Sequence, residues 1–180
     1  TAAREMYEPF HKLKYSFAAT YYDQMKNSLP KVVKDKGAKK VCAVYQDDEF
    51  GLEVLRGAKE GLKSIGMEMA EEASFKRGAT DFGSQMQKLA AAQCDFVVLG
   101  TIIRETVGTV ATARKLGFNP TFMGSSALYT DLIHKLGGPA MNGIYATMTV
   151  QNPYLDDASQ PVRFWANKYK TKFNEDPTVF

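Results

Sequence analysis

KKVCAVYQDDEFG, residues 39–51, decides the fold, because it joins a short apolar run to an acidic turn and the start of an amphipathic helix. Two later segments repeat this order: DFVVLGT at residues 95–101 and TFMGSS at residues 121–126. Strands that alternate with helices in this way pair in parallel through right-handed crossovers. The sequence therefore predicts an α/β domain with a doubly wound, Rossmann-like parallel sheet. The carboxyl ends of its strands should meet at one edge, where small molecules bind.

Hydrophobic spacing places the elements around this repeat. A helix is expected over residues 22–36, with Pro30 kinking or restarting it and Gly37 just past its end. A short strand is expected over residues 14–19, and a last strand over residues 142–150.

Polar residues that precede helical patterns predict where helices begin. Asp48, Thr80 and Ser126 are expected to be N-caps. Pro161 is expected to open a last helix, since proline suits the first helical turn. One face of this helix carries Val162, Trp165, Ala166, Tyr169 and Phe173.

The composition is that of an ordinary globular protein, with 44% hydrophobic and 24% charged residues among 180. This length suffices for one domain with a core and part of a second. The net charge is +3, but the lysines are scattered, so nucleic acid is not favoured as a partner. No apolar run approaches the roughly 20 residues of a membrane span. No signal peptide is evident, which does not exclude export because mature chains lose it.

The two cysteines carry little chemistry by themselves. Cys42 lies within the first predicted strand and Cys94 lies just before another. Their thiols are expected at different heights, so we interpret them as small buried hydrophobic residues rather than as a disulfide. No CxxC pair or Cys/His cluster indicates a zinc site.

The usual enzyme signatures are missing. No glycine-rich phosphate loop follows a strand, so no nucleotide cofactor is expected. Ser126 lies where a nucleophile elbow would place a serine, but the second glycine of that motif is absent. His134 is expected to be an exposed helix residue rather than its base. The acidic turn 47–49 is expected to complement a helix dipole rather than to bind a metal. This is the profile of a binding protein without catalysis.

Several segments together resemble the type I periplasmic binding proteins, in the leucine/isoleucine/valine-binding class of ABC-transporter solute receptors. They are VCAVYQDDEFGLEVLRG at 41–57, FKRGATDF at 75–82, CDFVVLGTIIRET at 94–106 and TFMGSSAL at 121–128. They occur in the family's order over about residues 14–180.

This resemblance implies a receptor of two α/β lobes with the ligand between them, of which this chain looks like the second lobe only. Residues 1–150 would be the ligand-binding lobe, and residues 151–180 the crossover and a helix that belongs to the missing lobe. The helix with Trp165 would then pack on that lobe or on another copy of the chain. The receptor would be periplasmic or otherwise extracytoplasmic, lipid-anchored in its parent form, and would serve an ABC permease without inserting into the membrane.

The resemblance also assigns candidate ligand-binding residues. Phe50 stands where the family often has a ligand-facing tyrosine, and Thr101 and Ile102 form the turn after the central strand. Ser126 and Tyr21 stand where amino-acid receptors carry acidic residues. Two further candidates lie near these positions by spacing: Ser125 and Arg104.

Because Ser126 and Tyr21 replace the acidic residues of amino-acid receptors, an amino acid is not favoured as the ligand. Its ammonium group would be buried without a carboxylate, which is costly. The expected ligand is an aromatic carboxylate, with its ring against Phe50 and Tyr21 and its charge near Arg104 or helix N–H groups. Each candidate residue also has a purely structural interpretation, as a core, capping, turn or solvated residue.

Three alternatives remain open: a branched-chain amino-acid receptor, a small α/β hydrolase acting through Ser126, and a sensory ligand-binding domain. The ligand-binding hypothesis requires the loops with Phe50, Thr101 and Ser126 to converge on one rim.

Overall fold

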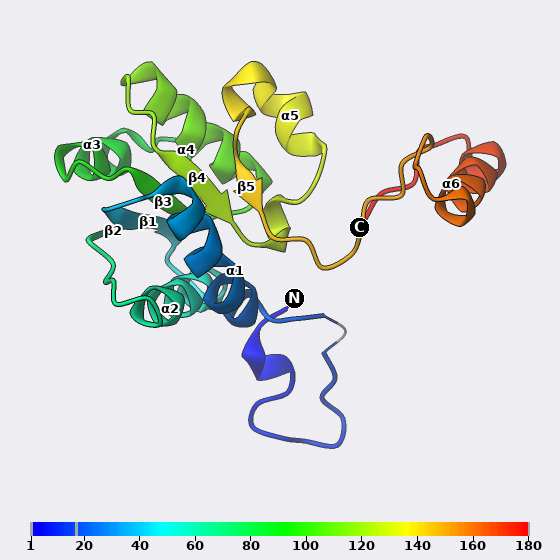
Figure 1. Cartoon of the computed structure of the whole chain (residues 1–180), viewed down its shortest axis with the longest axis horizontal. Helices are drawn as coiled ribbons and strands as arrows, with labels where there is room; N and C mark the ends of the chain where they lie inside the picture. The colour runs from blue at the N-terminus through cyan, green and yellow to red at the C-terminus, as the bar shows by residue number, and fades with distance from the viewer. Residues whose placement is uncertain (1, 17, 180) are drawn as a thin grey trace. The chain divides into compact units, whose positions relative to one another are not determined.

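The computed structural model describes residues 2–16 and 18–179. The chain divides into two compact units, Thr1–Thr147 and Met148–Phe180 (Figure 1). The first unit holds a five-stranded parallel sheet with strand order β2-β1-β3-β4-β5. This order and the parallel pairing confirm the predicted doubly wound α/β fold. The strands are β1 (Val41–Gln46), β2 (Glu71–Phe75), β3 (Phe96–Gly100), β4 (Thr121–Gly124) and β5 (Tyr145–Ala146).

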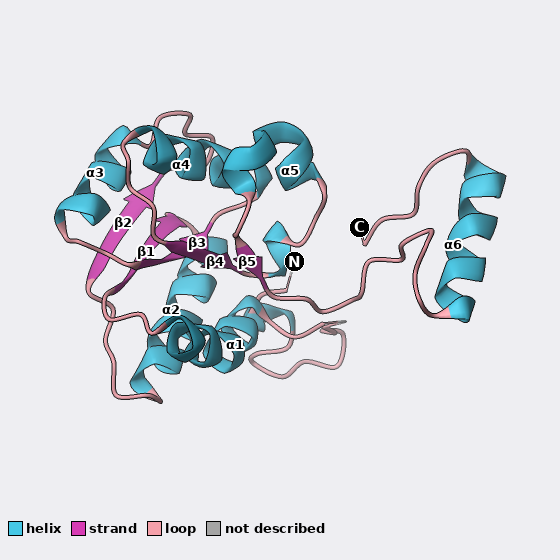
Figure 2. Cartoon of the chain, turned by 45° about the horizontal axis from the view of Figure 1, so that its top comes forward, coloured by secondary structure: helices cyan, strands magenta, loops and turns pink. Residues whose placement is uncertain are grey.

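Helices cover both faces of the sheet (Figure 2). One face is covered by α1 (Tyr21–Lys36) and α2 (Glu49–Lys63). The other face is covered by α3 (Gly83–Ala91), α4 (Ile103–Lys115) and α5 (Leu132–Gly137). Short 3-10 helices complete this unit: η1 (Arg4–Met6), η2 (Ser126–Leu128) and η3 (Gly138–Met141).

Strand β3 lies at the centre of the sheet, and all its residues are buried. Its side chains alternate between two cores, as the pleat of a strand requires. Phe96 and Val98 pack with the α1 and α2 side chains, whereas Val97 and Leu99 pack with those of α3 and α4. A continuous apolar run is therefore needed in a strand that is covered on both faces.

Helices α1 and α2 approach closely because two glycines of α2 face α1. A Cβ atom on Gly57 would lie 2.3 Å from the Tyr22 carbonyl oxygen, and one on Gly61 would lie 2.9 Å from that of Lys26. Both distances are far below van der Waals contact, so any larger residue would force the helices apart. This packing fixes where the first turns of the two helices lie at the edge of the sheet.

The prediction for the cysteines was wrong, because Cys42 and Cys94 form a buried disulfide with a Cα–Cα distance of 5.9 Å. Gln93 has a φ of 57°, which turns the chain sharply between α3 and β3. Cys94 therefore lies on the same face of the sheet as Cys42 instead of continuing the line of the strand. Sequence spacing along a presumed straight strand could not show this turn.

Two strand predictions were also wrong. The described residues of the 14–19 segment form no strand, and Phe17 lies outside the described residues. Tyr15 is 75% exposed there, so its ring is not packed in a core as it would be in a buried strand. The last strand pairs only through Tyr145 and Ala146, since the chain leaves the sheet after Thr147.

Two details of the helices also differ from expectation. Helix α1 continues through Pro30 without a restart, because Leu29 and Val33 on either side are anchored in the core. Thr80 does not cap α3; the Asp81 carboxylate accepts the Gly83 N–H instead, at 2.8 Å.

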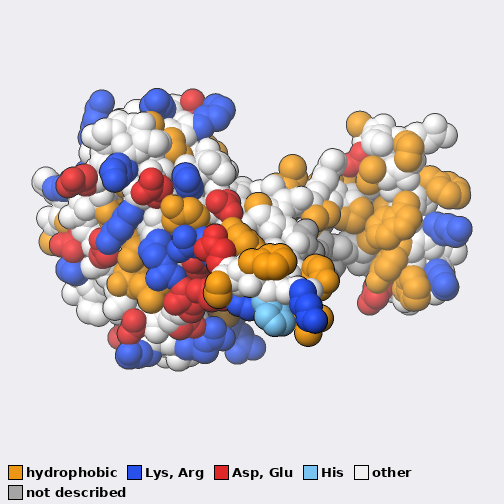
Figure 3. All heavy atoms as spheres, turned by 90° about the horizontal axis from the view of Figure 1, so that it is seen from below, with side chains coloured by type: hydrophobic (Ala, Val, Ile, Leu, Met, Phe, Trp, Pro, Cys, Tyr) orange, Lys and Arg blue, Asp and Glu red, His pale blue; other side chains and the backbone are white. Residues whose placement is uncertain are grey.

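The second unit contains α6 (Gln160–Phe173), which starts with proline in its first turn as predicted. The rings of Trp165, Tyr169 and Phe173 follow one another along this helix, with centroid separations of 5.6 and 4.6 Å. Trp165 and Phe173 remain about half exposed, and Figure 3 shows hydrophobic side chains gathered on this unit. Ala166 is the part of the predicted apolar face that is buried.

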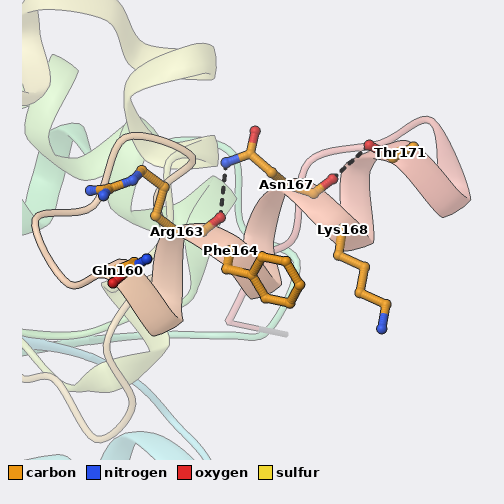
Figure 4. A pocket seen from close by; sticks show the side chains of 6 residues that line it. All are labelled: Gln160, Arg163, Phe164, Asn167, Lys168 and Thr171. Atoms are coloured by element: carbon orange, nitrogen blue, oxygen red, sulfur yellow. Dashed lines mark hydrogen bonds between the residues drawn. The ribbon is translucent and has the colours of Figure 1, made fainter.

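A shallow hollow runs along α6 and is lined by Gln160, Arg163, Phe164, Asn167, Lys168 and Thr171 (Figure 4). Side chains along the helix bond to its own backbone carbonyls: Asn167 to Arg163 and Thr171 to Asn167, each at 2.8 Å. The hollow is therefore a feature of one helix surface. Within the described part of the chain, no helix has the length and apolar character needed to cross a bilayer.

Candidate functional site

The turns that follow β1, β3 and β4 lie at one edge of the sheet. The parallel register pairs Tyr45 with Gly100, and Leu99 with Gly124. The three strands are adjacent, and each ends within one residue of its neighbour in this register. The turns that lead to Phe50, Thr101 and Ser126 thus leave the sheet at its carboxyl edge, as the sequence predicts for a doubly wound fold.

Tyr21 and Phe50 form an aromatic pair at this edge. Each is close to the first turn of its helix, α1 or α2, and both helices begin at the carboxyl end of the strands. Their ring centroids are 5.0 Å apart with an interplanar angle of 86°, an edge-to-face contact. Both side chains are half-buried against the core between these helices. Each side chain of the pair is thus partly packed against the core and partly exposed to solvent.

In the turn after β3, the Thr101 side chain points inward, although the sequence analysis named it as a candidate ligand-binding residue. The Thr101 side chain is fully buried, and its Oγ1 lies 2.6 Å from Thr106 Oγ1. Thr106 in turn donates to the Ile102 carbonyl oxygen at 2.8 Å. Ile102, 37% exposed, and the exposed Arg104 are the side chains that this turn offers at the surface.

Ser125 and Ser126 follow β4, and the prediction that Ser126 is a helix N-cap was wrong. Ser125, not Ser126, is the N-cap of η2, and its Oγ accepts the Ala127 N–H at 3.3 Å. Ser126 is the first residue of η2, and its backbone N–H donates to Gln24 Oε1 at 2.8 Å. Gly124 leaves room for the buried Leu128 side chain, because a Cβ there would lie 2.5 Å from that side chain.

The helices at this edge differ in how their N-termini are capped. Thr20 caps α1 by accepting the Asp23 N–H at 3.1 Å, and Asp48 caps α2 by accepting the Gly51 N–H at 3.2 Å. Ile102, the N-cap of α4, makes no side-chain capping bond. The first N–H groups of α4 are therefore available to an acceptor that is not a capping side chain.

Asp48, in the acidic turn, has a pKa that its surroundings shift. Burial alone would raise the pKa of Asp48, but hydrogen bonds from Arg77, the Gly51 N–H and Gln46 together lower this pKa below its ordinary value. The Arg77 contact is an ion pair at 2.8 Å. Asp48 is consequently charged and occupied as a cap and ion-pair partner.

Other carboxylates near this turn also have basic partners. Asp47 pairs with Lys76 at 2.6 Å, and Glu49 pairs with Arg56. Within the described residues, Glu5, Glu49 and Glu53 are close enough together to share a metal ion. Glu53 accepts from Arg4 at 3.0 Å, so arginines already neutralise this group.

The positions of the histidines give the hydrolase alternative no support. His134 is exposed on α5, and His11 is exposed in the N-terminal segment, where its ring accepts the Leu13 N–H. Among the described contacts, neither ring is hydrogen bonded to Ser126, which a serine nucleophile would need.

Sequence reasoning missed several buried polar residues at this edge, among them Gln24, Gln46 and Glu105. Gln24 joins the Ser126 turn to α1, while Gln46 and Glu105 each have one buried oxygen without a hydrogen-bond partner among the described residues. The sequence did hold one indication of their burial: helical or strand periodicity places each of these polar residues among apolar ones. Burial of such a residue is costly unless a specific partner compensates its polar atoms.

A family model described as periplasmic binding protein matches residues 7–180 of this chain. The Leu/Ile/Val-binding protein homolog 7 of Brucella suis is 23% identical over 155 residues, which cover 84% of this chain and 39% of that protein. A substrate-binding periplasmic protein from Ralstonia solanacearum has the same fold, with a TM-score of 0.84 at 22% identity over 99% of this chain and 50% of that one. A solute-binding protein of R. palustris, solved in complex with 4-hydroxybenzoate, gives a TM-score of 0.76 at 22% identity, over 90% of this chain and 45% of that one.

The chain thus spans about half of these solved relatives and less than half of the curated one. The family match extends over nearly all of its residues, and the five-stranded parallel sheet with helices on both faces is one α/β lobe. This chain belongs to the periplasmic binding protein family and comprises one lobe of its type I fold.

Proposed function

We propose that this lobe forms one wall of the ligand site in an extracytoplasmic receptor for ABC import, and that the ligand is an aromatic carboxylate. The observation that carries this proposal is the edge-to-face pair of Tyr21 and Phe50 at the carboxyl edge of the sheet. Aromatic rings attract a third ring by stacked or edge-to-face contact, which adds to the gain from burying its surface. Ile102 adds an exposed apolar side chain at the same edge.

The charges at this edge favour an anion. The first turn of α4 lacks a side-chain cap, and free N–H groups at a helix start bind carboxylates well. Arg104 is exposed in that same turn and can add a positive charge. Ser126 offers a hydroxyl group where a receptor for an ammonium group would need a carboxylate.

The proposed receptor has further parts. Residues 151–180 would be the crossover and a helix of the missing lobe, and the aromatic residues of α6 would pack on that lobe or on another copy. The parent receptor would be lipid-anchored on the outside of the membrane and would deliver its ligand to an ABC permease. The complex of the R. palustris relative with 4-hydroxybenzoate supports the ligand class.

A branched-chain amino acid is the second candidate. It is supported by the name of the Brucella relative and by Glu105 in the first turn of α4, whose buried Oε2 lacks a hydrogen-bond partner among the described residues. A ligand ammonium group would compensate such a carboxylate if it reached it.

Titration calorimetry of the two-lobed protein with 4-hydroxybenzoate, a hydroxycinnamate and leucine separates these candidates. We expect one of the aromatic acids to bind and leucine not to bind. Phe50→Ala should weaken aromatic binding by about tenfold, since an aromatic pair is worth roughly 0.5–1.5 kcal/mol beyond its buried area. Leucine binding without aromatic-acid binding would overturn the proposal in favour of the second candidate.

A further inference from the structure

Gln24 uses both polar atoms of its side chain to join three segments of the chain. It lies in the first turn of α1 and is 5% exposed. Its Nε2 donates to the Ala19 carbonyl oxygen at 2.7 Å. Its Oε1 accepts two hydrogen bonds of 2.8 Å each, from the Ser126 N–H and from Thr147 Oγ1. These last partners are 102 and 123 residues away in the sequence.

The two distant partners are the points where neighbouring strands leave the sheet. Ser126 follows β4, and Thr147 follows β5. The Thr147 N–H also donates to the Gly124 carbonyl oxygen at 3.1 Å, which extends the ladder between these strands. Thr147 is the last residue of the first compact unit. A single amide oxygen therefore connects the Ser125–Ser126 turn with the exit of the chain from the lobe.

A carboxamide suits this position better than any other side chain of its size. It needs an acceptor on the side of Ser126 and Thr147 and a donor on the side of Ala19, and glutamine supplies both without charge. The hydrogen bond to Ala19 also fixes the direction in which Oε1 points. Removing the amide would leave the Ser126 N–H buried without a partner, which costs more than the hydrogen bond itself contributes.

We propose that Gln24 is a positioning residue, which holds the Ser125–Ser126 turn and the chain exit at Thr147 in one fixed arrangement. In this proposal Gln24 does not contact the ligand. It acts indirectly, by fixing the Ser125–Ser126 turn that would contact the ligand. The link to ligand binding rests on the proposed function, whereas the hydrogen-bonding role does not.

Hydrogen exchange of backbone amides in this chain tests the positioning role without any ligand. In Gln24→Met, which keeps the length of the side chain but not its polar atoms, the Ser126 amide should lose about tenfold or more in protection factor. The Val98 amide in the central strand should change by less, reporting only the change in global stability. Gln87→Met on the exposed face of α3 is the matched control and should leave Ser126 unchanged.

Gln24→Glu provides a signature that a packing role would not produce. At about pH 5 a buried carboxyl group stays protonated, so it can donate to Ala19 and accept from Ser126 as the amide does. At about pH 8 the ionised group repels the Ala19 carbonyl oxygen. We expect protection of Ser126 similar to wild type at the lower pH and loss of it at the higher pH.

Three outcomes would overturn the positioning role: unchanged Ser126 protection in Gln24→Met, equal loss at Ser126 and Val98, or a Gln24→Glu variant that matches Gln24→Met at both pH values. In the two-lobed protein, Gln24→Met should also weaken binding of 4-hydroxybenzoate by about tenfold. Unchanged affinity with altered Ser126 exchange would overturn the link to the ligand. If the wild-type protein does not bind 4-hydroxybenzoate, the proposed function fails while the exchange result still stands.

Discussion

Glu53 places a carboxylate in the fully buried side of α2, where charge is costly to hold. Arg4 compensates it from the N-terminal segment, with its Nε at 3.0 Å and its backbone N–H at 3.2 Å from the two carboxylate oxygens. The Arg4 guanidinium also lies 4.1 Å from the centre of the Tyr22 ring. A short terminal segment is thus tied to the interface of α1 and α2 through one ion pair.

Arg4→Met should therefore destabilise the lobe by about 2–3 kcal/mol, because the longer contact with Arg56 would be the one remaining ion pair of the buried Glu53 charge among the described residues. Urea unfolding followed by circular dichroism measures this change. The double variant Arg4→Met/Glu53→Gln should recover part of the lost stability, because it also removes the buried negative charge of Glu53. As a control, Lys31→Met breaks an exposed pair with Asp35 and should cost less than about 0.5 kcal/mol. Equal effects of Arg4→Met and Lys31→Met would contradict the argument.

Asp48 gives the lobe a predictable response to acid. Its folded-state pKa is lowered by Arg77, Gly51 and Gln46 despite burial, so its contribution to stability is complete above the ordinary pKa of 3.8. This contribution is lost as the pH falls through the lower folded-state value. Asp48→Asn keeps a good N-cap but cannot titrate. We expect the free energy of unfolding to fall less between about pH 6 and pH 3 in this variant than in the wild type. Parallel curves over this range would show that Asp48 does not contribute.

At the scale of elements, the disulfide between Cys42 and Cys94 links β1 to the turn before β3. It closes a loop with a sequence separation of 52 residues, which includes α2, β2 and α3. A crosslink of this length restricts the unfolded chain and stabilises the fold by up to about 4 kcal/mol. Such bonds persist mainly in compartments in which thiols are oxidised, which agrees with the proposed extracytoplasmic receptor.

Reduction should accordingly lower the melting temperature of the wild-type chain. The double variant Cys42→Ala/Cys94→Ala should melt at a lower temperature than the oxidised wild type and should not respond to reductant. The measurement is thermal unfolding with and without dithiothreitol, with thiol titration to confirm the redox state. A wild-type chain that carries no free thiols yet melts at the same temperature as the double variant would contradict a stabilising role.

The elements that sequence predicted best are those whose pattern depends on local physics. The β1 and β3 runs are apolar because both faces are covered, and Asp48 caps α2 through a contact only three residues away. The features that the sequence predicted wrongly depend on contacts between residues that are far apart in the sequence. The 142–150 strand is short because the chain exits at Thr147, and Pro30 is tolerated in α1 because its neighbours are anchored in the core. Neither effect is visible in a window of sequence.

At the scale of the whole molecule, sequence placed the candidate turns at one edge because parallel topology alone requires it. It could not tell that the Thr101 hydroxyl bonds inward to Thr106, nor that Gln24 reaches Ser126 across 102 residues. Side-chain directions at a turn depend on which buried polar groups find partners. The sequence could therefore predict where these turns lie but not in which direction their side chains bond.

A lobe that offers one wall of a cleft should bind weakly alone, because half of the contacts must still oppose the full entropy of association. We expect the 180-residue chain to bind 4-hydroxybenzoate with a Kd no tighter than about 1 mM, which already requires roughly −4 kcal/mol. Chemical-shift titration can measure such affinity, and residues around Phe50 and the start of α4 should shift most. On the proposed function, the two-lobed protein should bind the same acid far more tightly, because contacts from both lobes would favour its closed state. Micromolar binding by the single lobe would mean that its carboxyl edge already forms a complete site, and the second wall would then be unnecessary for recognition.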